Sequence, residues 1–325
     1  MRRTAASLAA ALLLTSAALA GGCGSGGAEP DAPDGRAAAP ISLVLDFQPN
    51  AVHAGIYAAI ADGADIEVRE PGSTSDAPKL LEAGRVDAAI MDINDLGIAR
   101  ERGAGLVGIG AIVQVPLAAV IAGDAAAVRG PIDLAGLTVG VTGLPSDDAV
   151  LDTVLSAGGL GAGDIERQTI GFDSVPLLSA GRVDAATAFW NAEGVALREA
   201  GVPTREFRVD DFGAPRYPEL VLVTTEERLA DDRESIDELV AALKDGYANV
   251  AADPDAALST LVEAVPGLEE DQQAAQLDAL LAARAFKPSP LSLNPGPIAR
   301  WADWARAKGI LENPLAVDQA FDLSR

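Results

Sequence analysis

The chain has 325 residues, and 48 acidic against 24 basic side chains give it a formal net charge of −24. So acidic a chain is a poor partner for nucleic acid or for an anionic lipid surface. Its length suffices for one large or two modest domains, and its single cysteine excludes an internal disulfide bond.

The first residues predict export. Arg2 and Arg3 precede an apolar run over Ala5–Leu19, which has the form of a secretory signal peptide and is too short to span a bilayer. Cys23 follows the small residues of an LAGG stretch. This stretch resembles the lipobox of bacterial lipoproteins, in which the cysteine is lipidated after the signal is removed. The alternative is ordinary signal cleavage two residues earlier.

We therefore expect a signal peptide over residues 1–22 and a flexible tether, rich in glycine, alanine and proline, over residues 23–40. A lipid on Cys23 would anchor the protein to the outer face of the bacterial cytoplasmic membrane. No later run is long and apolar enough to span a bilayer.

After the tether, strands alternate with helices, which predicts parallel α/β sheets. In the first lobe, strands are expected at 41–45, 66–68, 86–91 and 106–113, with helices at 52–61, 76–82 and 94–102. Residues 113–122 lead into a second lobe, with strands at 137–141, 165–170 and 185–189 and helices at 146–157, 174–180 and 192–200. A strand at 220–224 returns the chain, and helices follow at 235–250, 254–264, 269–283 and 298–308. The expected division is lobe I over 41–112 and 206–325, and lobe II over 113–205.

An internal repeat supports two similar lobes. Ala83–Ala89 reads AGRVDAA and is identical to Ala180–Ala186, 97 positions later. Each copy has the pattern of a helix that ends near a glycine and leads into a strand. Two related lobes enclose a cleft, and clefts between lobes commonly hold small ligands. The alternative is a favourable helix-to-strand connection that the chain uses twice.

The segment Leu45–Tyr57 (LDFQPNAVHAGIY) is the strongest candidate for ligand contact. A predicted strand ends at Asp46, a turn follows, and Asn50 is placed to cap a helix. Loops at the carboxyl ends of parallel strands face the ligand crevice, so Asp46, Phe47, Asn50 and His53 are expected at the site. The residues alone leave a structural alternative open, in which they serve as cap, core and packing.

This segment resembles the LDWxPNxxHxGxY signature of the NMT1/THI5-like solute-binding proteins, with Phe47 where tryptophan is common. Gly140–Asp147, Phe189–Val195 and Arg216–Val223 resemble further elements of that family, and the second of these (FWNAEGV) resembles the WNxEG element of its thiamine-pyrimidine-precursor binders. One departure is that Ala58–Asp65 is shorter than its usual counterpart. The resemblance covers nearly the whole exported chain. It implies a periplasmic-binding-protein type II fold, in which two α/β lobes close on a ligand and deliver it to an ABC permease without a cofactor.

An aminopyrimidine fits the residue types of these segments. Aromatic rings stack on its flat face, carboxylates accept from its exocyclic amine, and amides serve its mixed edge because they both donate and accept. The aromatic rings expected to stack are Phe47, Tyr57 and Trp190. The expected carboxylates are Asp46 and Glu193, and the expected amides are Asn50 and Asn191. We expect Trp190 to face the cleft. For Glu193, in the first turn of a helix, the alternative is that it complements the helix dipole.

Further candidates lie at helix starts and near the crossing between the lobes. Free N–H groups at a helix start favour an anion, although serine and aspartate there are usually ordinary caps. The candidates added on these grounds, or from the family elements, are Ser73, Thr74, Asp92, Gln114, Thr142 and Tyr217. One histidine and one cysteine leave no transition-metal cluster of familiar spacing.

Three functions stay open. The leading one is a monomeric solute-binding protein for a thiamine pyrimidine precursor of the hydroxymethylpyrimidine or formylaminopyrimidine type. The second keeps this role with riboflavin, an alkanesulfonate such as taurine, or nitrate as the ligand. The third is a pyrimidine-synthase-like enzyme. It is disfavoured because the enzymes of that resemblance use a cofactor-linked lysine and a cysteine-rich element. Here Cys23 lies in the leader and no lysine lies between Ile41 and Lys79.

Overall fold

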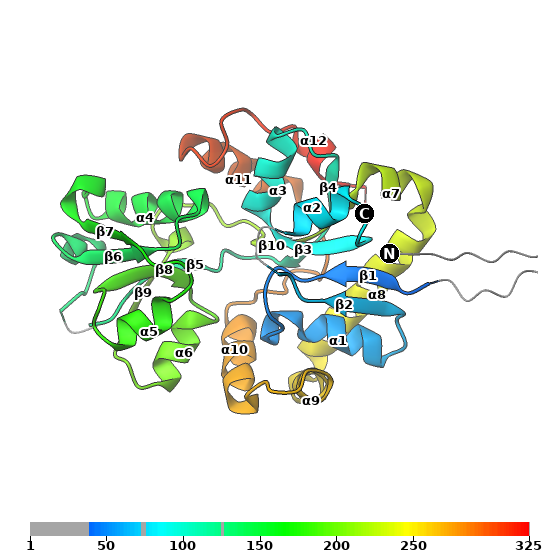
Figure 1. Ribbon diagram of the computed structural model, residues 1–325, viewed down its shortest axis with the longest axis horizontal. Helices are drawn as coiled ribbons and strands as arrows, with labels where there is room; N and C mark the ends of the chain where they lie inside the picture. Colours follow the sequence, from blue (N-terminus) through cyan, green and yellow to red (C-terminus); the bar gives the residue numbers. More distant parts are fainter. Residues whose placement is uncertain (1–38, 73–75, 125–126, 325) are drawn as a thin grey trace, which may run out of the picture. The chain divides into compact units, whose positions relative to one another are not determined.

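A computed structural model describes residues 39–72, 76–124 and 127–324. The predicted signal peptide, the lipidation candidate Cys23 and the candidates Ser73 and Thr74 lie outside these residues. From residue 39 onward, two five-stranded sheets with flanking helices form two lobes (Figure 1). The prediction of two α/β lobes is therefore confirmed.

Both sheets are mixed, whereas the alternation of elements predicted parallel sheets. In lobe I the strand order is β2-β1-β3-β10-β4, and β10 runs antiparallel to both of its neighbours. In lobe II the order is β7-β6-β8-β5-β9, and β5 is the antiparallel strand. Because β5 and β10 arrive from the other lobe and not through a helical crossover, each enters its sheet from the opposite end. The lobe I strands are β1 Ile41–Val44, β2 Ile66–Arg69, β3 Ala88–Asp92, β4 Leu106–Val113 and β10 Leu220–Thr225. The lobe II strands are β5 Ala118–Ala122, β6 Thr138–Val141, β7 Glu166–Thr169, β8 Ala185–Phe189 and β9 Arg205–Arg208. The short strand β9, which the sequence did not predict, carries the lobe II sheet three residues past the expected boundary.

Helices cover both faces of each sheet; in lobe I, α2 and α3 lie on one side and α1 with α8 on the other (Figure 1). The helices before residue 140 are η1 Ala51–His53, α1 Ala54–Ala61, α2 Ala77–Glu82, α3 Ile93–Glu101 and η2 Pro131–Leu134. Those up to the return strand are α4 Pro145–Ala157, η3 Ala162–Asp164, α5 Ser174–Ser179, α6 Glu193–Glu199 and η4 Val209–Asp211. The C-terminal helices are α7 Glu226–Asp231, α8 Arg233–Ala252, α9 Pro254–Ala264, α10 Glu270–Ala282, α11 Pro295–Ala307 and α12 Val317–Ala320. Among the described residues, no helix combines the length and apolarity needed to cross a membrane.

The sequence repeat is a structural repeat. In the first copy, the backbone N–H of Ser42 donates to the Asp87 carboxylate at 2.9 Å, and the Asp87 N–H donates back to the Ser42 carbonyl at 2.9 Å. In the second copy, Thr138 and Asp184 make the same two bonds at 2.8 and 2.9 Å. The aspartate of each AGRVDAA segment therefore ties its strand to the first parallel strand of the lobe, which explains why both copies keep it.

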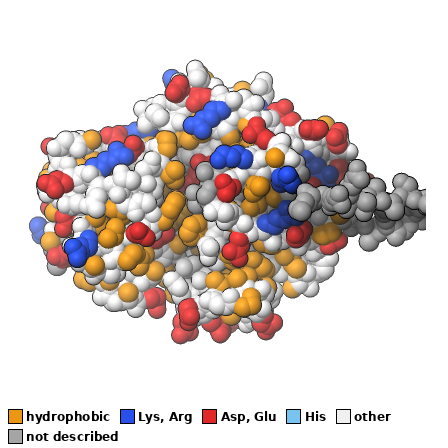
Figure 2. Space-filling model, viewed as in Figure 1, with side chains coloured by type: hydrophobic (Ala, Val, Ile, Leu, Met, Phe, Trp, Pro, Cys, Tyr) orange, Lys and Arg blue, Asp and Glu red, His pale blue; other side chains and the backbone are white. Residues whose placement is uncertain are grey.

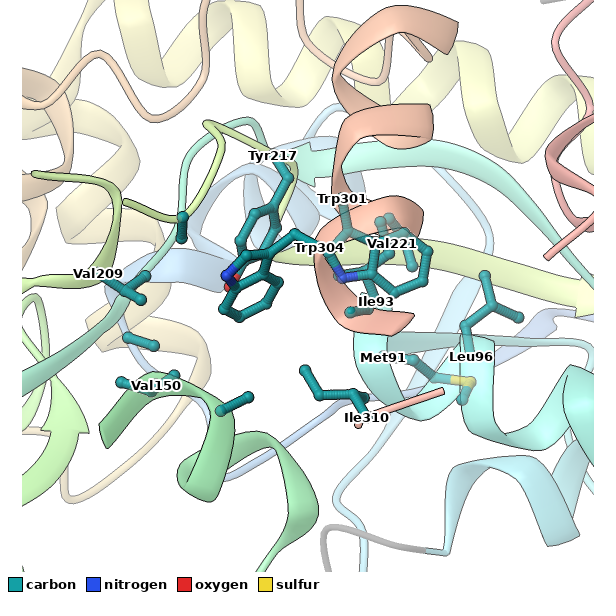
Figure 3. Packing of buried hydrophobic residues seen from close by; sticks show 14 of the residues in the cluster. Met91, Ile93, Leu96, Val150, Val209, Tyr217, Val221, Trp301, Trp304 and Ile310 are labelled. Carbon is teal, nitrogen blue, oxygen red and sulfur yellow. The ribbon is translucent and has the colours of Figure 1, made fainter. Parts of the chain in front are cut away.

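The C-terminal helix α11 joins the lobe I core to lobe II. Trp304 of α11 stacks on Tyr217 with 5.6 Å between ring centroids, and Figure 3 shows this pair close to Val150 of α4 and Val209. At the end of the same helix, Lys308 forms an ion pair with Asp152 of α4 at 2.6 Å. The C-terminal third therefore packs against both lobes. On the face shown in Figure 2, acidic side chains are spread out and not gathered in one patch.

Helices α1 and α8 approach each other closely through two glycines. A Cβ atom on Gly246 would collide with the carbonyl oxygen of Gly55 and with Ala59. We expect Gly246→Ala to lower the free energy of unfolding by about 1–3 kcal/mol, because the backbones must separate. Urea denaturation measures the change. Gly163→Ala is the control, since a Cβ atom there meets nothing within 4 Å. Equal stability of the two variants would contradict the close packing.

Candidate ligand-binding site

A cavity of about 250 Å³ lies between the two sheets. Its walls come mainly from the loops that follow β1, β3, β6, β7 and β8, and Gln276 of α10 also lines it. These loops leave the carboxyl ends of their strands, as the sequence predicted. The volume lies just below the usual range for ligand pockets, roughly 300–1,000 Å³, and suits a single-ring compound.

The cavity is acidic. The carboxyl side chains on its walls are Asp46, Asp92, Asp95, Asp147 and Glu193. Among the described residues that line it there is no lysine, arginine or histidine. Carboxylates only accept hydrogen bonds and carry negative charge, so the walls favour a ligand that donates hydrogen bonds or is cationic.

His53 orients Asp46 from behind the cavity wall. The backbone N–H of Asn50 donates to His53 Nδ1 at 3.1 Å, so this nitrogen carries no proton. The other ring nitrogen, Nε2, therefore donates to Asp46 Oδ1 at 2.8 Å. His53 is fully buried and does not line the cavity. Its role in the structure is to fix the rotamer of Asp46, while Asn50 caps η1 by accepting from Val52 N–H at 2.9 Å.

Two carboxyl groups on lobe II are held by backbone and hydroxyl donors. Asp147 Oδ2 accepts from the N–H of Thr142 at 2.6 Å and from the hydroxyl of Thr187 at 2.7 Å. Glu193 Oε2 accepts from the N–H of Phe189 at 3.0 Å. Burial raises the pKa of Glu193, and the charge of Asp147 adds to the rise. The lobe II wall therefore presents two oriented acceptors with fixed geometry.

The lobe I wall holds carboxyl groups that resist ionisation. Burial raises the pKa of Asp95 to about 6, with Arg102 opposing the rise and Asp46 adding to it. Burial also raises the pKa of Asp92 well above its usual range, and the neighbouring charge of Glu219 adds to the effect. At a pH below its raised pKa, each of these carboxyl groups is protonated and can donate as well as accept hydrogen bonds.

Two aromatic rings from opposite lobes meet at the cavity. Phe47 follows β1 and Phe172 follows β7, and their ring centroids are 6.1 Å apart. The two residues remain 42% and 55% exposed, which is unusual for phenylalanine and places them at the mouth. The aromatic rings expected from the sequence at this site were Phe47, Tyr57 and Trp190. In the structure Phe47 lines the cavity together with Phe172, and Tyr57 and Trp190 do not.

Two buried amides on the cavity walls lack a partner for their oxygen. Asn191 lies in the turn between β8 and α6, Gln276 lies on α10, and neither amide oxygen has a hydrogen bond. An unpaired buried polar atom costs free energy. A ligand that donates a hydrogen bond to it removes this cost and therefore binds more tightly. On the same helix, Gln273 accepts from Ala51 N–H at 2.8 Å and holds α10 against η1.

Comparison with known proteins places the chain in a family. The family model described as "NMT1/THI5 like" matches residues 50–257. The chain belongs to this family. The formylaminopyrimidine-binding protein of Halalkalibacterium halodurans is 29% identical over 305 residues, which cover 89% of this chain and 92% of that protein. The 4-amino-5-hydroxymethyl-2-methylpyrimidine phosphate synthase THI13 of Saccharomyces cerevisiae is 22% identical over 248 residues, or 71% of this chain and 73% of that protein.

A solved structure supports the fold of this NMT1/THI5-like chain. The alkanesulfonate-binding protein SsuA of Xanthomonas axonopodis pv. citri, bound to MOPS, superposes with a TM-score of 0.68 over 87% of this chain and 98% of that protein, at 18% identity. At this identity the likeness speaks for the fold alone. The fold is that of the type II periplasmic binding proteins, as the sequence predicted.

The site residues predicted from the sequence of this NMT1/THI5-like chain divide into two groups among the described residues. Those that line the cavity are Asp46, Phe47, Asn50, Asp92, Thr142, Asn191 and Glu193. Those that pack elsewhere are His53, Tyr57, Gln114, Trp190 and Tyr217. Gln114 donates to the carbonyl of Ser292 at 2.9 Å and so fastens the loop before α11. Tyr57 and Tyr217 are buried, and burial raises both of their pKa values, that of Tyr57 to about 12.

Trp190, expected to face the cleft, is instead buried beside the segment that connects the lobes. Its indole N–H donates to the carbonyl of Pro116 at 3.0 Å, and the guanidinium of Arg208 lies 3.9 Å from its ring centroid. Only 1% of Trp190 is exposed. The motif therefore places its Asn and Glu at the cavity and its Trp behind them.

Several cavity residues were not among the predicted ones. The missed side chains that the site uses are Asp95, Asp147, Phe172 and Gln276. Asp95 and Asp147 carried a usable signal, because each lies in the first turn of a helix that follows a predicted strand. Phe172 also carried a signal, because it follows the strand predicted at 165–170. Gln276 carried none, since only the tertiary packing brings α10 to the cavity.

Proposed function

We propose that this protein is the extracytoplasmic solute-binding component of an ABC importer and that it binds a thiamine pyrimidine precursor. The observation that carries the proposal is the cavity itself, which combines oriented carboxyl groups and unpaired amides with an aromatic rim. An aminopyrimidine offers an exocyclic amine to a carboxylate such as Glu193 and a mixed donor and acceptor edge to Asn191. Its flat ring suits Phe47 and Phe172.

The charge of the cavity argues against the other ligands of the same role. The sulfonate group of an alkanesulfonate, like nitrate, brings negative charge and only acceptors, and the described lining offers it no basic side chain. Placing such an anion among five carboxyl groups is unfavourable unless several of them are protonated. Riboflavin has three fused rings and a ribityl chain, which exceed a cavity of about 250 Å³.

The synthase function is less well supported. It requires a lysine at the reacting centre, and the described cavity lining contains none. The relative that is 29% identical is named as a binding protein, whereas the synthase relative is 22% identical. We therefore propose binding without chemistry on the ligand, with lobe closure as the event that a permease reads.

The proposal extends to the place of the protein in the cell. The sequence before residue 39 suggests export and a lipid on Cys23, and the relatives of this fold include periplasmic sulfonate-binding proteins. The partners would be the membrane subunits of an ABC importer and the membrane surface, with the protein acting as a monomer. Mass spectrometry of the membrane-bound protein tests the anchor. An unmodified N-terminus at Gly21 would overturn it.

Calorimetric titration tests the ligand. The full chain is titrated with 4-amino-5-hydroxymethyl-2-methylpyrimidine, formylaminopyrimidine, taurine, nitrate and riboflavin. We expect heat of binding from the two pyrimidines only. Binding of taurine or nitrate alone would keep the fold and the transport role but overturn the ligand. Turnover of a pyrimidine into a new product would overturn the binding role.

Glu193 gives a direct test of the cavity as the pyrimidine site. We expect Glu193→Ala to weaken pyrimidine binding by about 10- to 100-fold, because a hydrogen bond to a charged group is worth about 1.5–3 kcal/mol. The matched control is Glu199→Ala, at the exposed end of the same helix. Isothermal titration measures both affinities. Unchanged binding in Glu193→Ala would remove this carboxylate from the site.

A further inference from the structure

One side chain joins both segments that connect the lobes. The first segment, residues 114–117, links β4 to β5, and the second, residues 212–219, leads into β10. Glu219 ends the second segment. Its Oε2 accepts from the N–H of Leu117 in the first segment at 2.6 Å and from that of Ala118, at the start of β5, at 3.4 Å. Its own carbonyl accepts from Ile93 N–H at 2.9 Å. Glu219 is 1% exposed, so these bonds are made away from solvent.

Asp92 carries this arrangement into the cavity. Asp92 ends β3, pairs in register with Leu220 and caps α3 by accepting from Asn94 N–H at 2.7 Å. Beyond the effect of burial, the charge of Glu219 raises the pKa of the Asp92 carboxyl group. Two neighbouring buried carboxyl groups repel each other when both are ionised, so the pair favours a state with one proton and one negative charge. Asp92 lines the cavity and Glu219 does not.

The surroundings of the pair are mostly acidic. Beyond the effect of burial, the charge of Asp95 on α3 raises the pKa of Asp92, and the charge of Asp210 on η4 raises that of Glu219. Burial and the charges of the pair raise the pKa of the Tyr217 phenol. Burial raises the pKa of Asp210, and the charges of Arg216 and Arg208 oppose this rise. Burial also raises the pKa of Asp95, where the charge of Arg102 opposes the rise and that of Asp46 adds to it. Burial raises the pKa of Glu219 to about 7, and its backbone donors limit the rise. Loss of the pair's proton would leave two adjacent buried carboxylates that repel each other.

We propose that Asp92 and Glu219 form a hinge clamp, in which Glu219 holds the two connecting segments together and Asp92 accepts a hydrogen bond from a donor group of the ligand. This inference rests on the proposed function for its ligand, but its hinge part stands on the contacts of Glu219 alone. A ligand amine bound to Asp92 neutralises part of the negative charge of the pair. This reduces the repulsion between the two carboxyl groups and strengthens the hydrogen bonds of Glu219 to the first segment. The clamp thereby makes lobe geometry sensitive to a donor-bearing ligand and insensitive to an anion.

The amide protons of Leu117 and Ala118 report the clamp directly, because both donate to Glu219. Hydrogen exchange followed by mass spectrometry over residues 114–120, corrected for the intrinsic rate, gives their protection in the full chain. Without ligand, we expect protection to fall about tenfold from pH 6 to pH 8.5, the factor that corresponds to one hydrogen bond. Glu219→Gln keeps an acceptor for these protons and adds an amide donor for Asp92. In this variant the amide protons of Leu117 and Ala118 should therefore be equally protected at pH 6 and pH 8.5.

The ligand arm uses 4-amino-5-hydroxymethyl-2-methylpyrimidine as the probe at pH 8.5. We expect it to restore protection in the wild type and in Glu199→Ala, because Glu199 is exposed and does not line the cavity. In Asp92→Ala the probe should leave protection unchanged at saturating concentration. Equal protection at pH 6 and pH 8.5, or a full ligand response in Asp92→Ala, would overturn the clamp.

The two proposals fail separately. If calorimetry finds no pyrimidine binding to the wild type, the proposed function fails, and the ligand-free comparison of wild type with Glu219→Gln still decides the hinge part. If pyrimidines bind but protection does not depend on pH or on Glu219, the binding role stands and the clamp is wrong. Circular dichroism of each variant confirms that changes in protection come from the segment and not from global unfolding.

Discussion

Replacing Trp190 with alanine is expected to lower the free energy of unfolding by about 3–5 kcal/mol, the usual cost of truncating a large buried aromatic side chain. Trp190 is 1% exposed, donates to the Pro116 carbonyl at 3.0 Å and lies under the Arg208 guanidinium. Alanine would leave a cavity beside the first connecting segment and an unpaired carbonyl. Urea denaturation, followed by circular dichroism, measures the loss.

Two further variants separate packing from ligand contact. Trp190→Phe retains most of the ring and loses the indole donor, so a loss of about 1–3 kcal/mol is expected. Phe172→Ala removes an exposed aromatic side chain at the cavity mouth and should change stability by less than about 0.5 kcal/mol. If Trp190→Ala instead kept its stability and lost ligand affinity, the sequence-based expectation that Trp190 faces the cleft would be correct.

Local patterns in the sequence predicted the helices and strands well, because the apolar residues within a segment largely determine whether that segment forms a helix or a strand. The apolar run 106–113 is β4, residues 185–189 are β8 and residues 254–264 are α9, with the expected bounds. The direction of β5 and β10 could not be predicted in this way. It depends on which neighbour each strand meets after crossing between lobes, and that neighbour is far away in the sequence.

The site was predictable where it depends on strand ends and not where it depends on rotamers or distant helices. Asp46, Asn50 and Glu193 follow strands or begin helices, so their places at the cavity follow from the topology. His53 belongs to the same motif, but the two hydrogen bonds of its ring turn it toward Asp46 and out of the cavity. Gln276 reaches the cavity because Gln273 fastens α10 to η1, a contact that spans 222 positions.

The free energy of unfolding is expected to fall by about 3 kcal/mol as the pH rises from about 5 to about 8. Burial raises the pKa of Glu219 from 4.5 to about 7, and each unit of such a shift corresponds to about 1.4 kcal/mol. Between these two values the folded protein keeps a proton that the unfolded chain has released. Folding therefore binds protons, and stability is full below the unfolded pKa and is lost as the pH rises through the folded one.

Asp95 acts in the same direction, since burial raises its pKa from 3.8 to about 6. The exposed carboxylates Asp133 and Asp232 have lowered pKa values, held down by backbone and hydroxyl donors, so any contribution from them is lost only at lower pH. Urea denaturation at pH 5 and pH 8, followed by tryptophan fluorescence, measures the difference. Glu219→Gln should show a smaller difference, because it keeps the acceptor and removes the titrating group. Greater stability at pH 8 than at pH 5 in the wild type would show that the buried carboxyl groups ionise without cost, and the acidic cavity wall would then need another source of compensation.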